Sequence, residues 1–179
     1  MKKLHLGCGF QILPGYVNVD RAAIKGVDVV CDLRVIPWPF PDNEFNAILL
    51  THVLEHLPDT LPAIEELWRI AKPGAKVTLR VPFWNSFHAF RDPTHYRTFH
   101  SESFDFYDPN TALNKQCSYY THARFKIARK DYFISLAGGR DDRGWYQVRL
   151  PLVKWFLDLL ARHICGIIYF IEVDLIAVK

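Results

Sequence analysis

Two glycines and an acid near the start of the chain have the spacing of a nucleoside-binding site. Gly7 and Gly9 follow a short apolar stretch, and Asp20 ends the next one. Glycines after a buried strand let a ligand approach the backbone closely. An acid at the tip of the neighbouring strand is where open α/β sheets hold the hydroxyls of a ribose. The stretch therefore predicts a ligand that contains a ribose.

The same stretch argues against a dinucleotide. The G-x-G-x-x-G fingerprint requires a third glycine, and this chain has Ile12 there. Dinucleotide sites also place their acid roughly 20 residues after the glycines, and Gly9 and Asp20 are closer together than that. With a turn at Pro14, no full helix fits between the two predicted strands. A ribose ligand without a phosphate cradle fits better, and S-adenosylmethionine (SAM) is such a ligand. A nicotinamide oxidoreductase is the weaker alternative.

The elements that must position these residues alternate between strands and connections. Such alternation is typical of a parallel sheet with layers on both faces, so we expect an α/β fold. One domain over residues 1–179 is expected, with a long structured substrate or lid loop at 83–110 and an insertion at 138–166 between the last two strands. Strands are predicted at residues 3–7, 16–20, 27–32, 45–50, 76–81, 124–135 and 167–179, and helices at 60–71, 101–107 (capped by Ser101) and 152–163.

Composition excludes several classes of protein. A net charge of +3, evenly spread, does not indicate a nucleic-acid partner. The four cysteines form no CxxC pair, and no histidine or cysteine pair has the spacing of a compact zinc site, so we expect reduced thiols, a cytoplasmic protein and no metal. Charged residues interrupt the apolar C-terminal region, so no transmembrane segment is expected. Strand is predicted too close to Met1 for a signal peptide.

Several motifs in the first half of the chain occur together in one known family. They are Leu6-Gly-Cys-Gly9, the acid Asp20, the pair Asp32-Leu33, and the string ILLTHVLEHL from Ile48 to Leu57. Over residues 3–82 the chain resembles the class I SAM-dependent methyltransferases, closest to the compact type-11 branch. The DPTHYR string at 92–97 is also similar. The resemblance implies a three-layer Rossmann-like fold with a mostly parallel seven-stranded sheet, one antiparallel strand and the order 3-2-1-4-5-7-6.

The resemblance also implies a set of cofactor contacts at the carboxyl edge of the sheet. Asp20 would accept hydrogen bonds from the ribose hydroxyls, and Asp32 would accept one from the adenine amine. The glycine turn would lie along the methionine part of SAM. The cofactor-binding residues implied in this way are Gly7, Cys8, Gly9, Asp20, Asp32, Leu33, Thr51 and His52.

The reaction implied is methyl transfer from SAM to a small-molecule acceptor, with S-adenosylhomocysteine as the product. Its chemistry is an in-line displacement that needs mainly positioning. A general base is required only for an acceptor such as a hydroxyl, and histidine suits that role near neutral pH. The candidates are His95, with His52 and Asp92 behind it. The acceptor atom (O, N or C) stays open, and a SAM- or nucleoside-binding module without catalysis is the alternative.

Two further segments carry structural expectations. Glu55 and His56 are expected to satisfy backbone groups at a strand–helix connection. The helix at 152–163 has only a narrow polar stripe, formed by Lys154, Asp158 and Arg162, so most of its surface is apolar. One sheet face cannot cover such a helix, so either the long loop packs on its other side or the helix makes a dimer or membrane-surface contact; of these we favour a homodimer.

Overall fold

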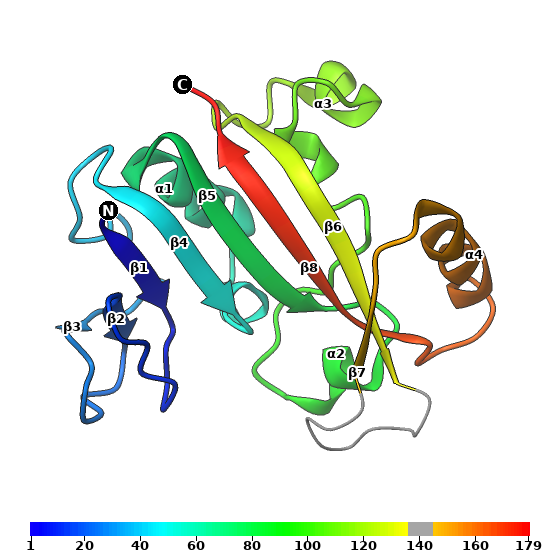
Figure 1. The fold of residues 1–179 in the computed structure, drawn as a ribbon, viewed down its shortest axis with the longest axis horizontal. Coiled ribbons are helices and arrows are strands. Elements are labelled where there is room, and N and C mark those ends of the chain that lie inside the picture. The colour runs from blue at the N-terminus through cyan, green and yellow to red at the C-terminus, as the bar shows by residue number, and fades with distance from the viewer. Residues whose placement is uncertain (136–144) are drawn as a thin grey trace.

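The computed structural model describes residues 1–135 and 145–179, and it confirms the expected α/β fold class (Figure 1). A single sheet has the strand order β3-β2-β1-β4-β5-β8-β6-β7. Strands β1 to β5 run parallel, and β8 is antiparallel to both β5 and β6. The strands are β1 (Lys3–Leu6), β2 (Val17–Asp20), β3 (Val29–Val30), β4 (Phe45–Thr51), β5 (Ala71–Pro82), β6 (Phe125–Ser135), β7 (Trp145–Val148) and β8 (Ile168–Ala177).

The sheet has eight strands in the described residues, one more than expected. The expected order 3-2-1-4-5-7-6 is present once the last strand is counted as the seventh. The additional strand is β7, which pairs antiparallel with β6 at the sheet edge, so two strands rather than one are antiparallel. Its four residues lie inside the expected 138–166 insertion, and they are too few for a clear alternating pattern. Residues 138–144 of that insertion lie outside the described residues.

Short helices connect the strands in the described residues. They are α1 (Thr60–Ile70), α2 (Phe87–Arg91), α3 (Ala112–Cys117) and α4 (Pro151–Ala161), with 3₁₀ helices η1 (Leu54–His56) and η2 (Asp105–Tyr107). The predicted helix at 101–107 is wrong: only η2 forms, and its N-cap is Phe104, without a side-chain cap, and not Ser101. Just before it, Ser103 Oγ accepts from the backbone N–H of His100 at 2.9 Å. Local hydrogen bonds from such side chains compete with a regular helix.

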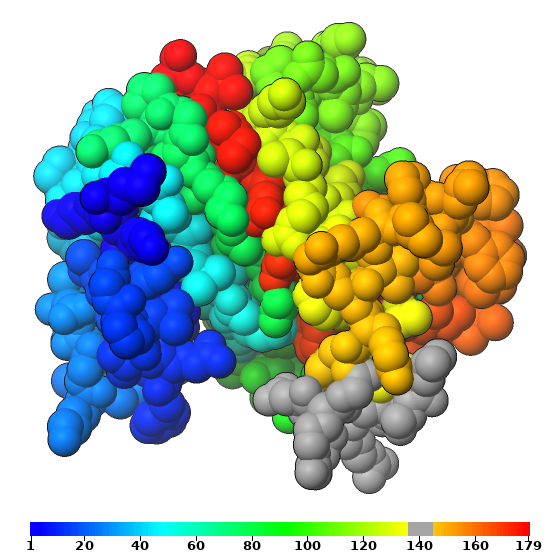
Figure 2. Space-filling view, in the orientation of Figure 1, coloured from blue at the N-terminus to red at the C-terminus, as the bar shows by residue number. Residues whose placement is uncertain are grey.

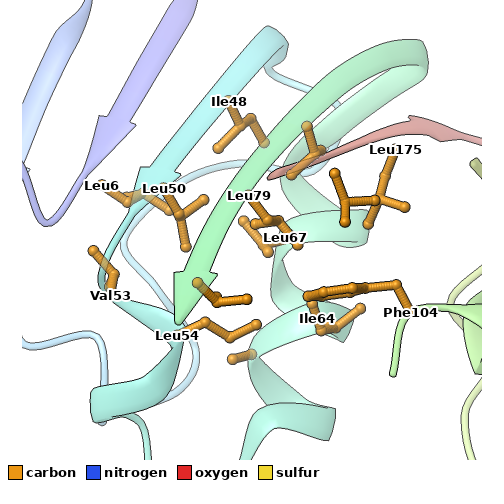
Figure 3. Packing of buried hydrophobic residues seen from close by; sticks show 14 of the residues in the cluster. Leu6, Ile48, Leu50, Val53, Leu54, Ile64, Leu67, Leu79, Phe104 and Leu175 are labelled. Carbon is orange, nitrogen blue, oxygen red and sulfur yellow. The ribbon is translucent and has the colours of Figure 1, made fainter. Parts of the chain in front are cut away.

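Helix α1 packs its apolar face against one face of the sheet. Ile64 and Leu67 lie fully buried beside Leu50 and Leu79 of the central strands (Figure 3). The helix begins where predicted because Asp59 caps it, accepting from the backbone N–H of Leu61 at 3.1 Å. This layer fixes the central strands whose carboxyl ends form the site described below.

Within the part of the chain that the structure describes, no helix covers the opposite face of the central sheet (Figure 1). Figure 2 shows the atoms of β1, β4, β5, β8 and β6 directly on that face. Strand β5 accordingly alternates, with Val77 and Leu79 buried toward α1 and Thr78 and Arg80 half-buried on the open face. The second helical layer expected from the resemblance therefore does not cover these strands.

Ion pairs take the place of helical cover on this open face. The Arg129 guanidinium donates to Asp131, Glu172 and Asp174 over 2.6–2.8 Å. Arg80 also donates to Glu172, at 3.0 Å through Nε. Because each carboxylate has a cationic partner, the polar side of the sheet is satisfied without a packed layer.

Helix α4 stands at the edge of the molecule (Figure 1), and much of its apolar surface is exposed. Leu152 is 83% exposed and Trp155 66% exposed, whereas Leu157 is buried. Self-association through this helix stays a prediction. Within residues 1–135 and 145–179, no helix has the length and hydropathy needed to span a bilayer.

Candidate functional site

The turn after β1 requires glycine at its first position. Gly7 has φ +64°, and a Cβ atom there would lie 2.3 Å from Cγ2 of the buried Val53. Gly9 has φ +51°, and its Cβ position faces open space. The Gly9 backbone N–H donates to Asp20 Oδ2 at 2.8 Å, which fixes the turn to the tip of β2. The glycine turn and Asp20 therefore hold each other in place.

A cleft of about 420 Å³, which we call the acid cleft, opens at this carboxyl edge. Asp20 and Asp32 reach it from the ends of neighbouring strands, as expected for an open α/β sheet. Asp20 also accepts from the backbone N–H of Ala22 at 2.9 Å, and its remaining lone pairs are free to accept from hydroxyl groups. The lining residues are Gly7, Asp20, Arg21, Cys31, Asp32, Leu33, Arg34, His52, Val53, His56, Leu57, Asp92, Thr94 and Tyr96.

Asp32 is held by a cation that the sequence analysis did not single out. Arg34 donates to both carboxylate oxygens, from Nε at 2.9 Å to Oδ1 and from a terminal nitrogen at 2.5 Å to Oδ2. These hydrogen bonds lower the pKa of Asp32 to about 2, so the group is ionised near neutral pH. An adenine amine would meet a charged acceptor whose orientation Arg34 has already set.

A second cleft of about 570 Å³, the aromatic cleft, adjoins the first and shares Gly7 and His52 with it. Its aromatic walls include three residues of the second half of the chain, two of which, Trp145 and Phe170, pack with ring centroids 5.0 Å apart. The Arg80 guanidinium lies 4.5 Å from the ring centroid of Phe133, in cation–π geometry. The lining residues are His5, Gly7, Cys8, Phe10, Gln11, Thr51, His52, Arg80, Phe133, Trp145 and Phe170.

His52 stands at the junction of the two clefts in a strained conformation. Its φ is +56°, a region that non-glycine residues adopt rarely and that clusters at functional sites. Two contacts hold it there: its backbone N–H donates to Arg80 O at 2.9 Å, and Nδ1 donates to Glu55 Oε1 at 3.2 Å. The ring also packs edge-on against Phe170. With Nδ1–H engaged, Nε2 is the nitrogen left to accept a proton.

The predicted cofactor residues divide between the clefts. Gly7, Asp20, Asp32, Leu33 and His52 line the acid cleft. Two others, Cys8 and Thr51, line the aromatic cleft, and Gly9 lies in the turn without lining either. The structure thus brings the whole set to one sheet edge, and the roles assigned to its members stay predictions.

The three predicted catalytic residues are only partly brought together. Asp92 shares the acid cleft with His52, and its pKa is lowered mainly by a hydrogen bond from the hydroxyl of Thr94. His95 is not among the residues that line either cleft. Its Nδ1 donates to Ala89 O at 3.1 Å. A direct role for His95 on an acceptor thus gains no support from its position.

Comparison with known proteins shows which fold this chain shares with solved structures. Residues 5–79 match the family model described as "Methyltransferase domain". A SAM-dependent methyltransferase from Thermotoga maritima, titled a possible histamine N-methyltransferase, superposes with a TM-score of 0.65 and 14% identity, over 99% of this chain and 82% of that one. A SAM-dependent methyltransferase from Archaeoglobus fulgidus superposes with a TM-score of 0.62 and 18% identity, over 98% of this chain and 85% of that one. Over residues 5–79 the chain is thus similar to this methyltransferase domain, and its fold is that of the SAM-dependent methyltransferases. The methyltransferase fold thus accounts for the strand order.

Curated relatives match only parts of this chain. Ajmaline N-methyltransferase from Rauvolfia serpentina is 32% identical over 84 residues, which are 44% of this chain and 29% of the relative. Demethylmenaquinone methyltransferase from Anoxybacillus flavithermus is 44% identical over 39 residues, 22% of this chain and 16% of the relative. The matched parts span less than a third of either relative.

Proposed function

We propose that this chain transfers a methyl group from SAM to a small planar acceptor. The observation that carries the proposal is the meeting of two clefts at Gly7 and His52, one lined by acids and the other by aromatic rings. The acid cleft and the turn beside it fit SAM: two backbone N–H groups orient the Asp20 carboxylate, and a Cβ at Gly9 would meet no atom within 4 Å. SAM supplies a methyl group that its sulfonium has already activated.

The chain's own contribution is orientation and selection. Asp20 would hold the ribose hydroxyls, and Asp32 with Leu33 would hold the adenine. Positioning of this kind can contribute roughly 7–11 kcal/mol to lowering the barrier. Fixing the adenosine part in the acid cleft would leave the aromatic cleft to the acceptor, on the other side of His52.

The walls of the aromatic cleft favour a flat acceptor that bears negative charge. Trp145 and Phe170 offer ring faces and edges for stacking, and Arg80 provides a cation beside them. For a hydroxyl acceptor, His52 replaces His95 as our first candidate for the general base. It lines both clefts, and its Nδ1–H is fixed by Glu55, which leaves Nε2 free to take the proton.

Calorimetric titration with SAM, S-adenosylhomocysteine and NADH tests the cofactor. We expect binding of the first two and none of NADH, and binding of NADH alone would refute the proposal. Asp20→Asn should weaken S-adenosylhomocysteine binding by about 1–3 kcal/mol, or roughly 5- to 150-fold, since it removes a charged acceptor. Asp28→Asn is the matched control, because Asp28 accepts from Asn18 N at 2.7 Å and lines neither cleft.

A methyl-transfer assay over an acceptor panel tests the reaction. Aromatic carboxylates and phenols should be methylated in preference to aliphatic amines of similar size. Arg80→Met should raise KM for the anionic acceptors several-fold and leave S-adenosylhomocysteine affinity unchanged. Tight S-adenosylhomocysteine binding without turnover of any acceptor would instead favour the alternative, a SAM-binding module.

A further inference from the structure

A buried carboxylate beside the acid cleft has an oxygen without a partner. Glu55, in η1, is 0% exposed. Its Oε1 accepts from His52 Nδ1, but within the described residues Oε2 has no hydrogen-bond partner. An ionised carboxylate in that position is costly unless a cation or donor meets it. The sequence analysis gave Glu55 and His56 a backbone-satisfying role, which leaves this oxygen unexplained.

Two imidazole rings adjoin this carboxylate. The rings of His56 and His95 meet edge to face with centroids 4.6 Å apart. One ligand atom each from Glu55, His56 and His95 lie within 4.8 Å of one another. The three residues come from segments almost forty positions apart in the chain, which explains why no local spacing signalled them.

Both rings are oriented through the same nitrogen. His56 Nδ1 lies 2.9 Å from Thr94 Oγ1, and that hydroxyl donates to Asp92 Oδ1 at 2.7 Å, so Nδ1 of His56 is the donor. His95 Nδ1 donates to the carbonyl of Ala89. Nε2 of each neutral ring is therefore left with a lone pair. Such a bond from the second ring nitrogen to a carbonyl, hydroxyl or carboxylate is the usual support of a metal-ligating histidine.

We propose that Glu55, His56 and His95 bind a divalent transition-metal ion of the zinc class. Two imidazole nitrogens and one carboxylate oxygen form a ligand set that Zn²⁺ accepts, with a fourth position left for water. The ion would neutralise the unpartnered oxygen of Glu55. It would also join η1 to the 87–97 segment, which already meets it where Tyr96 N donates to Glu55 O at 2.8 Å.

Cobalt titration of the full-length, chelator-treated protein tests this site directly. We expect one equivalent of Co²⁺ per chain, with the visible absorption of a four-coordinate site, displaced by one equivalent of Zn²⁺. Glu55→Gln and His95→Ala should each weaken Co²⁺ binding by about 100-fold or more. Thr94→Val, which removes the support of His56 but no ligand, should weaken it roughly 10- to 100-fold.

His122→Ala is the control variant. His122 is exposed and also lies beside a glutamate, with Nδ1 3.3 Å from Glu65 Oε1, and it should leave the titration unchanged. Because Zn²⁺ would bind only the folded state, it should raise the midpoint temperature of thermal unfolding of the wild type and of His122→Ala. It should not raise that of His95→Ala. Absence of stoichiometric Co²⁺ binding in the wild type, or equal binding by wild type, His95→Ala and Thr94→Val, would overturn the proposal. These readouts do not depend on methyl transfer.

Discussion

Replacing Gly7 with alanine separates steric fit from backbone freedom at the turn that shapes both clefts. Gly7 and Gly9 have nearly the same backbone conformation, with φ +64° and +51°. Their surroundings differ: a Cβ at position 7 would lie 2.3 Å from Val53 Cγ2, while one at position 9 would meet no atom within 4 Å. The pair therefore forms an internal control in which only the clash differs.

The magnitudes follow from these two terms. A left-handed conformation costs an L-residue about 1–2 kcal/mol, and both variants bear this cost. Overpacking a well-filled core costs a further ~1–3 kcal/mol, and only Gly7→Ala bears it, because Val53 belongs to the packed cluster in Figure 3. We therefore expect Gly7→Ala to lower the free energy of unfolding by about 2–5 kcal/mol and Gly9→Ala by about 1–2 kcal/mol.

Chemical denaturation of a double-mutant cycle measures the clash itself. Val53→Ala removes Cγ1 and Cγ2, so the alanine at position 7 would meet only Cβ, at 3.3 Å. Gly7→Ala combined with Val53→Ala should then cost less than the sum of the single changes, by about 1–2 kcal/mol, as residues in contact do not act additively. Equal losses for Gly7→Ala and Gly9→Ala, together with an additive cycle, would refute the steric reasoning.

Three further predictions concern stability and assembly. Burial acts to raise the pKa of Asp108, but hydrogen bonds, led by the one from the backbone N–H of Ile127, lower it, and the net shift is downward. Because the pKa is lower in the folded than in the unfolded state, the ionised carboxylate stabilises the fold above about pH 4. This stabilisation is lost as the pH falls through the folded pKa. Asp108→Asn should thus lower the free energy of unfolding by ~1–3 kcal/mol at neutral pH and flatten the acid limb of a plot of stability against pH. An unaltered acid limb would exclude this role for Asp108. Arg129→Met should cost about 2 kcal/mol in urea unfolding, because it removes the cation that three carboxylates share. The exposed Lys76→Met should cost ~0.5 kcal/mol or less, and similar losses would contradict the network. Trp155→Glu should reduce self-association in light scattering, and a wild type that stays monomeric at high concentration would remove α4 as a dimer contact.

The first half of the fold could be predicted because its signals are local. Strands β1, β2 and β4 are short runs rich in apolar residues; Asp20 ends β2, and Asp32 stands two residues after β3. Carboxyl ends of parallel strands meet at one edge, so spacing alone brought these acids together. The third strand was predicted too long, at 27–32, whereas β3 covers Val29–Val30, since an edge strand paired on one side ends where its neighbour stops.

The aromatic cleft could not be predicted because it depends on pairing between distant strands. Phe133 of β6 lies opposite Phe170 of β8, and this register carries both toward the end of β5 near Arg80. Aromatic residues in a sequence are more often core than site, and only the register decides which face they occupy. The additional strand β7 adds Trp145 to the same cleft, beyond the part of the chain that resembled the family.

The segment after β5 links the two proposals of this structure. Thr94 lines the acid cleft and at the same time holds His56, a ligand of the proposed ion site. Adenosine in the cleft and an ion behind it would therefore stabilise the same arrangement of residues 92–96. By linkage each ligand must then raise the affinity of the other by the same factor. Titrating S-adenosylhomocysteine with and without Zn²⁺ measures that factor, and equal affinities would confine the ion to a role in the fold alone.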